Sequence, residues 1–193
     1  MIKAAYVNIW NKRVGAVAWN EEEGIATFRY DPEFLETGLD LSPVMMPLNE
    51  SLNYRFPEHR NTTTFKGLPG MLADVLPDKY GNALINQWLV KHNRPAKSIN
   101  PVETLCFIGK RAMGALEFEP AIRGLPTQSK RVDLEKMVTL ANRILDERAN
   151  LQGVFTGEDD KDAIENILRI GTSAGGARAK AILAWNPETN EFR

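Results

Sequence analysis

Apolar and polar residues alternate through most of the first thirty positions, in three runs that cover residues 3–10, 14–20 and 25–30. The runs are rich in Val, Ile, Tyr, Trp and Phe, and alternation of this kind is typical of half-buried β-strands. The segments between them, residues 11–13 and 21–24, are short enough to be tight turns. The pattern therefore predicts an antiparallel meander of three strands.

Helical spacing of apolar residues begins near residue 68. Residues 68–75 predict a helix that ends before a Pro-Asp pair, and Asp78 is placed to cap a longer helix over residues 79–93. Asn100 is followed by proline and predicts the cap of a third helix, which runs over residues 101–107. The apolar face of the longest helix is formed by Leu84, Ile85, Trp88 and Leu89.

The segment that follows the meander is irregular in pattern. Asp31, followed by proline, predicts a single helical turn. Residues 41–48 contain two prolines and predict an extended segment or an edge strand. Residues 49–64 are expected to form a polar loop in which His59 is solvated. Alternation returns at residues 114–119, which predict a strand that closes the first structural unit.

The second half of the chain predicts a linker followed by helices and a hairpin. Residues 121–132 are linker-like, residues 133–150 predict an amphipathic helix, and residues 162–170 predict a short one. Residues 181–185 predict a strand, and residues 186–190 a turn that opens a hairpin. Half a hairpin leaves backbone groups unpaired, so we expect the chain to be part of a longer protein.

Composition narrows the class of protein. The chain has 193 residues, of which 43% are hydrophobic and 25% charged, which is enough for one or two small domains with a core. The formal net charge of -1 gives no overall attraction to nucleic acid or anionic membranes. One cysteine, Cys106, lies in an apolar run and is expected to be a buried free thiol. Without a leader or spanning run, we expect a cytoplasmic protein with no membrane contact and no metal site.

A glycine-rich segment over residues 170–180 is the main candidate for chemistry. Its glycines free the backbone to present a row of N–H groups, which is a typical anion-binding arrangement. Arg178 and Lys180 add positive charge suited to phosphate. The candidate phosphate-binding residues are Ser173, Ala174, Gly175, Gly176, Ala177, Arg178 and Lys180.

Three other interpretations of this segment are a protein-kinase glycine loop, a Walker A loop and a plain turn. The protein-kinase loop, G-x-G-x-x-G followed by Val, does not fit the residues letter by letter. A Walker A loop does not fit, because Ala177 and Arg178 stand where Lys and Ser or Thr are required. A plain flexible turn between a helix and a strand fits the composition equally well, because glycine and serine are common turn residues. From the residues alone, both the phosphate cradle and the plain turn stay open.

Four segments, taken in order, resemble the HipA family of bacterial serine/threonine kinases, which are the toxins of toxin–antitoxin operons. Arg13-Val-Gly15 resembles the R-V-G of the family's first hairpin. Residues 68–78, LPGMLADVLPD, resemble its L-P-D segment, and residues 107–116, FIGKRAMGAL, its I-G…G-A-L segment. Residues 170–180 resemble its glycine-rich loop, although Arg178 and Ala179 depart from the commoner loop sequence.

The resemblance implies an α+β fold with three parts. Residues 1–119 would form the family's N-terminal coupling domain, with a small antiparallel sheet and helices. Residues 120–170 would form a helical connecting segment, and residues 171–193 the glycine-rich loop and first strands of a truncated kinase-like N-lobe. The catalytic and metal-binding residues would lie beyond residue 193. ATP and Mg²⁺ are implied for the full-length protein.

The resemblance also implies regulation and partners. Ser173 matches a loop serine whose autophosphorylation silences kinases of this family, and Thr172 is a neighbouring candidate. The implied partners are a HipB-like helix-turn-helix antitoxin, through which DNA is reached indirectly, and a protein substrate.

Three hypotheses about the chain follow. It is the N-terminal part of such a kinase and inactive alone, or it is a free-standing regulatory module that binds a kinase or an antitoxin. An unrelated α+β domain with a chance loop is the third. The glycine-rich loop favours the first, because a module that only binds other proteins has no need of a phosphate cradle.

Overall fold

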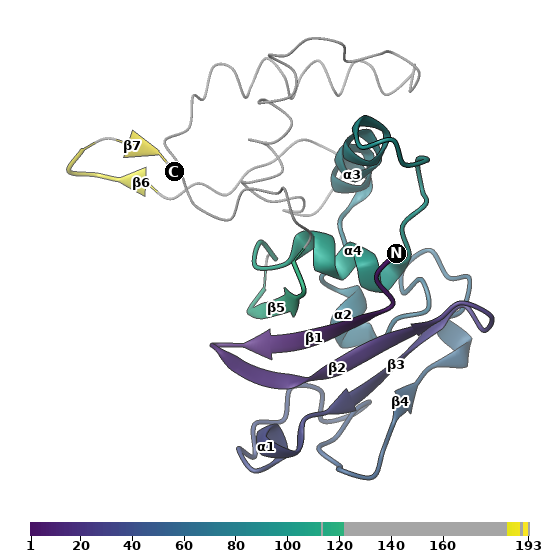
Figure 1. Cartoon of the computed structure of the whole chain (residues 1–193). Helices are drawn as coiled ribbons and strands as arrows, with labels where there is room; N and C mark the ends of the chain where they lie inside the picture. The colour runs from purple at the N-terminus through teal and green to yellow at the C-terminus, as the bar shows by residue number, and fades with distance from the viewer. Residues whose placement is uncertain (113, 122–184, 190, 193) are drawn as a thin grey trace. The chain divides into compact units, whose positions relative to one another are not determined.

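The computed structural model of the chain describes residues 1–112, 114–121, 185–189 and 191–192 (Figure 1). It divides into two compact units, which we describe separately. The first combines residues 1–76 with 97–122, and the second combines residues 77–96 with 123–193. The predicted helices over 133–150 and 162–170 lie outside the described residues, as does the glycine-rich loop.

A five-stranded antiparallel sheet forms the first unit, with the strand order β4-β3-β2-β1-β5. The predicted meander is confirmed as its three central strands, and the α+β prediction is confirmed with it. The predicted strand near residue 116 pairs with the outer edge of β1. The bounds are β1 Ala4–Ile9, β2 Lys12–Asn20, β3 Ile25–Tyr30, β4 Tyr54–Arg55 and β5 Leu116–Glu119.

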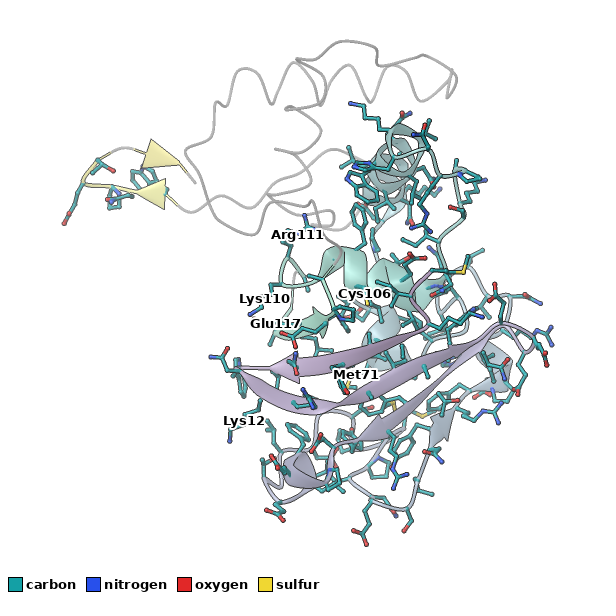
Figure 2. All side chains as sticks on the ribbon, viewed as in Figure 1. Lys12, Met71, Cys106, Lys110, Arg111 and Glu117 are labelled. Carbon is teal, nitrogen blue, oxygen red and sulfur yellow. The ribbon has the colours of Figure 1, made fainter. Side chains whose placement is uncertain are left out.

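One face of the sheet carries the core. Helix α4, Pro101–Ile108, lies on this face against β1, β2 and β5, and the short helix α2, Gly70–Ala73, adds Leu72 to the same core (Figure 1). All residues of α4 after its first are buried, including Cys106 (Figure 2). The strand residues that contribute to the core include Val7, Val17, Phe28, Tyr30 and Phe118.

The predicted helix caps are present. The side chain of Asn100 accepts a hydrogen bond from Glu103 N at 2.8 Å, and Asp31 caps the four-residue helix α1, Pro32–Leu35. Gly109, which has a φ of 57°, ends α4, and its carbonyl accepts from Phe118 N at 3.1 Å. The glycine of the I-G…G-A-L motif therefore turns the chain from α4 toward β5.

Two sequence-based expectations were wrong. Residues 41–48 form bends and turns, with no strand. Pro43 and Pro47 lack the N–H that a strand ladder needs, and Met46 is instead buried, with its carbonyl accepting from Tyr30 Oη at 2.8 Å. The edge strand is β4, inside the segment expected to be a polar loop.

His59 is the second correction. It ends a 3₁₀ turn, η1 Pro57–His59, and is half-buried, not solvated. Its ring stacks on Phe65 with centroids 3.9 Å apart, and Nδ1 lies 2.7 Å from the carbonyl oxygen of Leu68. The apolar neighbours of His59 lie up to nine residues away along the chain, which the local polar composition did not reveal.

In the second unit the described parts are a helix and a hairpin. Helix α3, Lys79–Lys91, begins at Asp78, whose carboxylate accepts from Gly81 N at 2.8 Å, as predicted. Strands β6, Trp185–Asn186, and β7, Glu191–Phe192, pair antiparallel, which confirms the predicted hairpin. Among all the described helices, none has the length and apolar character needed to cross a membrane.

Candidate functional site

The residues predicted to bind phosphate, Ser173 to Ala177 with Arg178 and Lys180, lie outside the described residues. The phosphate cradle and the phosphorylation of Ser173 therefore stay predictions. Of the segments that resemble the HipA family, the first hairpin and residues 68–78 are described completely, and residues 107–116 are described except for position 113. The first hairpin leads to a polar pocket in the first unit.

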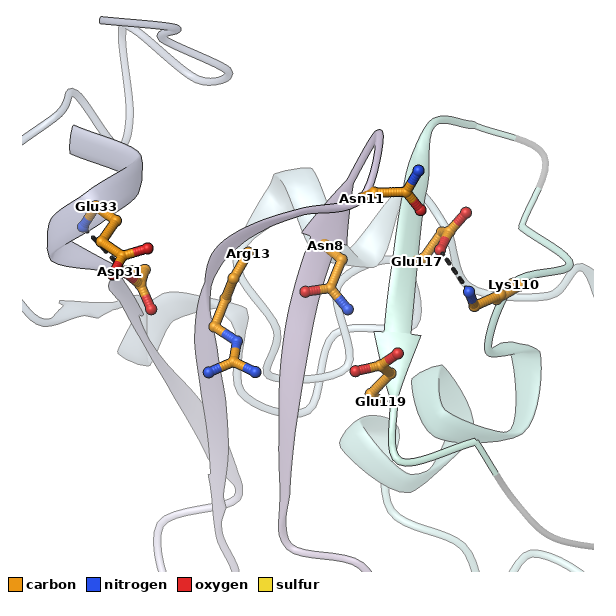
Figure 3. Close-up of a pocket in the computed structure, with 8 residues that line it drawn as sticks. All are labelled: Asn8, Asn11, Arg13, Asp31, Glu33, Lys110, Glu117 and Glu119. Atoms are coloured by element: carbon orange, nitrogen blue, oxygen red, sulfur yellow. Dashed lines mark hydrogen bonds and ion pairs between the residues drawn. The ribbon is translucent and has the colours of Figure 1, made fainter. Parts of the chain in front are cut away.

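The polar pocket lies on the outer face of the sheet, away from the core, and has a volume of about 340 Å³. It is lined by side chains from β1, β2 and β5, from their hairpin, from the start of α1 and from the turn after α4 (Figure 3). Four carboxylates and two cations line it. The lining residues are Asn8, Asn11, Arg13, Asp31, Glu33, Lys110, Glu117 and Glu119.

The β1–β2 hairpin sets the position of Arg13 in this pocket. Trp10 and Asn11 form a two-residue turn with φ of 50° and 62°, and Ile9 pairs with Lys12 across it. Two positive φ values are typical of a type I′ turn, which matches the twist of the strands. The predicted turn over residues 11–13 therefore lies one residue too late along the chain.

A β-bulge follows directly after this turn. Asn8 pairs with Arg13, whereas Val7 pairs with Gly15, so Val14 is an extra residue on β2. Side chains alternate between the two faces of a strand. In a regular strand Arg13 and Val17, which are four residues apart, would therefore lie on the same face. Because Val17 faces the core, Arg13 would face it too without the extra residue. The bulge lets Val14 be fully buried while Arg13 points outward, opposite Asn8.

Asn8 lies at the centre of the pocket. In register it is flanked by Arg13 on β2 and by Glu117 on β5, and Figure 3 shows its amide between these strands. As a residue it is 9% exposed, and its side-chain amide makes no hydrogen bond within the described part of the chain. The amide atoms are not among the buried unpartnered side-chain atoms of the described residues, so they reach solvent through the pocket.

Only some of the charged side chains that line the pocket make an ion pair, a cation–π contact or a hydrogen bond. Lys110 Nζ lies 3.5 Å from Glu117 Oε2 (Figures 2 and 3). The guanidinium of Arg13 lies 3.9 Å from the centre of the Tyr6 ring. Asp31 accepts from Glu33 N at 3.0 Å, as a helix cap. The carboxylates of Glu33 and Glu119 have no ion pair within the described residues.

The described lining of the pocket holds neither a metal-ligand cluster nor a cysteine. In residues 1–112 and 114–121, no three Asp, Glu, His or Cys side chains are grouped as a metal site requires. The only cysteine is not a nucleophile for this pocket, since Cys106 is fully buried, and burial followed by the nearby Glu103 charge raises its pKa to about 12. The lining of the pocket carries four carboxylates and two cations, so the charge of the pocket is net negative.

Sequence reasoning named three members of this pocket for other reasons: Arg13 and Lys110 lie in segments that resemble the HipA family, and Asp31 was predicted as a helix cap. It did not bring them together, and it missed the other lining residues. Asn8 and Glu117 occupy outward positions of alternating strands, where polar side chains are ordinary and carry no distinguishing mark. Their closeness depends on the pairing of β1 with β5, which are more than one hundred residues apart.

Comparison with known families gives a match over the first part of the chain. The model of the HipA N-terminal domain matches residues 5–119, which is more than half of the chain and covers the five strands of the sheet apart from Ala4. A search of the curated proteins gives no match. The chain thus belongs to the HipA family, and residues 5–119 are its N-terminal domain.

Proposed function

We propose that this chain is the N-terminal part of a HipA-like serine/threonine-protein kinase, the toxin of a type II toxin–antitoxin pair. Membership of the HipA family is the observation that carries the proposal. The glycine-rich segment over residues 170–180, which follows the matched domain, supports it further. In this proposal the full-length protein transfers a phosphoryl group from ATP to a protein substrate.

The chain's own contribution to that reaction is to hold phosphate. Backbone N–H groups of residues 173–177 donate to phosphate oxygens, and Arg178 and Lys180 add charge-assisted hydrogen bonds. ATP and Mg²⁺, when bound, supply the phosphoryl group and neutralise charge on it. Residues that orient the attacking hydroxyl and hold the metal are expected in the part of the protein beyond residue 193.

Regulation is proposed to act through Ser173. A phosphate on this serine adds a charge of about -1.5 to -2. It competes with the phosphates of ATP for the same N–H groups and for Arg178 and Lys180. Phosphorylation of the loop would therefore switch the kinase off without any change in the N-terminal domain.

The N-terminal domain is proposed to bind the partner protein. The expected partner is a HipB-like helix-turn-helix antitoxin, which would bring the toxin to DNA only indirectly. The complex would act in the cytoplasm. The outer face of the sheet supports this proposal, because it carries the polar pocket and the exposed Tyr6.

The first experiment is to read the gene beyond codon 193 and to assay the protein that the whole frame encodes. We expect the frame to continue into a catalytic segment, and the purified product to incorporate phosphate from radiolabelled ATP with Mg²⁺. Residues 1–193 alone are expected to incorporate none. Phosphorylation by residues 1–193 alone would contradict the assignment of catalysis to the later part.

A stop codon directly after codon 193 would favour the second hypothesis, a regulatory module that binds a separate kinase or an antitoxin. The assay then changes to mixing this chain with the kinase encoded beside it. Restraint of that kinase's autophosphorylation would establish the module. Under that outcome the kinase assignment of this chain is abandoned.

A further inference from the structure

The segment that links α1 to β4, residues 36–53, carries a group of exposed apolar side chains (Figure 1). Nine large apolar side chains are exposed in the described residues, and four of them belong to this one segment. They are Leu39, Val44, Met45 and Leu52, with Val44 87% and Met45 57% exposed. Single exposed apolar residues are ordinary, whereas a group of them on one segment is typical of a binding surface.

Hydrogen bonds fix the tip of this segment. Met46 N donates to the carbonyl of Ser42 at 2.8 Å, which closes a turn over residues 42–46 with Val44 and Met45 at its apex. We call residues 42–46 the apolar turn. Met46 is itself buried, and its carbonyl accepts from Tyr30 Oη at 2.8 Å. The exposed apex is therefore preorganised, so that binding there costs little conformational entropy.

The apolar turn lies in an acidic part of the chain. Residues 31–54 contain no Lys, Arg or His, and their five carboxylates belong to Asp31, Glu33, Glu36, Asp40 and Glu50. None of these carboxylates forms an ion pair within the described residues. The guanidinium of Arg29 donates at 3.3 Å to the backbone carbonyl of Glu50, and not to its carboxylate. The segment therefore concentrates negative charge in a chain that is almost neutral as a whole.

Asp40 brings one of these charges to the base of the apolar turn. Its carboxylate accepts from Ser42 N at 3.3 Å, and the residue is exposed. Burial, followed by the charge of Asp40, raises the pKa of both Tyr30 and Tyr54, so this carboxylate lies near both hydroxyls. The same Tyr30 hydroxyl holds the turn through Met46. A partner that covers the apex therefore meets a negative charge beside it.

The charge of this segment decides between the occupants that an apolar surface can have. Nucleic acids and anionic lipid surfaces are repelled by five carboxylates without ion pairs. A second copy of the chain would bring the same carboxylates against the turn, so self-association through it is disfavoured. A protein segment with both apolar and Lys or Arg side chains matches the apex and its surroundings. Met45 is flexible and can adapt to the shape of such a segment.

We propose that the apolar turn is the docking site for a basic segment of a protein partner. Apolar side chains of that segment cover Val44 and Met45, and one of its Lys or Arg side chains pairs with Asp40. The other carboxylates of residues 31–54 attract the segment over a longer range. That the partner is the antitoxin would rest on the proposed function, whereas the chemistry of the docking site does not.

The docking site is tested with a synthetic peptide on the complete 193-residue chain. The probe is a short amphipathic peptide of Leu and Lys at helical spacing, and its two controls carry Glu in place of Lys or Ser in place of Leu. In ¹H–¹⁵N spectra we expect the backbone amides of residues 39–46 to shift with the Leu–Lys peptide and with neither control. A dissociation constant on the order of 0.1 mM is expected, since two apolar side chains and a few exposed charges contribute.

Variants decide whether the apex and the charge are both responsible. The double change Val44→Ser, Met45→Gln is expected to weaken probe binding roughly tenfold. Asp40→Asn keeps the hydrogen-bond acceptor, removes the charge and is expected to weaken binding roughly threefold. Val90→Ser on α3 and Glu22→Gln at the β2–β3 turn make the same kinds of change at other exposed positions and are expected to change nothing. Equal binding of the Leu–Glu peptide, or unchanged binding in the double variant, would overturn the proposal.

Other occupants have their own readouts. Binding of the chain to phosphatidylcholine vesicles that the double variant abolishes would assign the turn to a lipid surface and overturn the proposal. A dimer in sedimentation equilibrium that the double variant breaks would assign it to a second copy, with the same consequence. If the probe fails to bind while the full-length protein is an active kinase, the docking proposal falls and the proposed function stands. If the probe binds as expected and the full-length protein has no kinase activity, the docking proposal stands and the proposed function falls.

Discussion

Gly15 lies on β2 opposite Tyr30 of β3, directly after the bulge that turns Arg13 outward. A Cβ atom at this position would overlap the carbonyl oxygen of Arg29 and press on the ring of Phe28. Its φ is not in the left-handed region, so the requirement for glycine comes from space alone. The R-V-G motif thus has a physical role, in which Val14 forms the bulge and Gly15 lets the neighbouring strand approach.

We expect Gly15→Ala to lower the free energy of unfolding by about 1–3 kcal/mol, because overpacking against a backbone carbonyl forces the strands apart. Urea denaturation followed by circular dichroism measures this. Gly114→Ala is the matched control, because nothing lies within 4 Å of a Cβ at that glycine, and a change within about 0.5 kcal/mol is expected. Equal stability of the two variants would refute the close approach at Gly15.

Tyr30 gives a prediction that depends on pH. Its hydroxyl donates to the carbonyl of Met46 at 2.8 Å. Burial, followed by the charges of Asp40 and Tyr54, raises its pKa from 10.0 to about 12. Between pH 10 and 12 the unfolded state loses this proton while the folded state keeps it, so the free energy of unfolding falls as pH rises.

Tyr30→Phe removes both the hydrogen bond and this titration. At pH 7 we expect a loss of about 1 kcal/mol, and between pH 10 and 12 a flatter decline of stability than in the original chain. Urea unfolding at pH 7, 10.5 and 11.5 measures both effects. Tyr6→Phe, at an exposed tyrosine, is the control. If both variants show the same pH dependence as the original chain, the assignment to Tyr30 is wrong.

At the scale of elements, the start of α4 joins the helix to the N-terminal strand region. Asn100 Oδ1 accepts from Glu103 N at 2.8 Å, and its Nδ2 donates to the carbonyl of Ile2, also at 2.8 Å. One side chain therefore caps a helix and ties it to residues almost one hundred positions earlier. The cap was visible in the sequence, whereas the second bond depends on the fold.

Asn100→Ala is expected to lower the free energy of unfolding by about 1–3 kcal/mol, since a cap and a second, partly buried hydrogen bond are both lost. Asn100→Asp keeps the capping oxygen and loses only the donor to Ile2. It is expected to recover about 1 kcal/mol of the loss. Chemical denaturation of the original chain and of the two variants measures the three free energies of unfolding. No recovery in the aspartate variant would show that the cap contributes little.

The elements also differ in how far the sequence predicted them. Alternation located β1, β2 and β3, because a strand with one buried face repeats every two residues. The edge strand β4 has two residues only, too few for any period, and was placed wrongly at residues 41–48. His59 was misjudged for a related reason, because its stacking partner Phe65 lies beyond the polar residues around it.

At the scale of the whole molecule, regulation through the glycine-rich loop gives the last prediction. In the full-length protein incubated with ATP and Mg²⁺, Ser173→Ala is expected to abolish phosphorylation of the loop, because it removes the accepting hydroxyl. Mass spectrometry of the peptide that contains residues 171–180 measures this. Thr172→Ala is the matched control and should keep the phosphate. Undiminished phosphate in the Ser173 variant would reject the assignment.

The sequence by itself determined the central meander, the caps at Asp31, Asp78 and Asn100, and the order of motifs that points to the HipA family. These features depend on residues a few positions apart, so they can be read locally. Only the tertiary structure decided that β5 pairs with β1 and that a bulge turns Arg13 outward. The polar pocket follows from those two facts, because it unites residues from position 8 to position 119 through backbone pairing that no local pattern encodes.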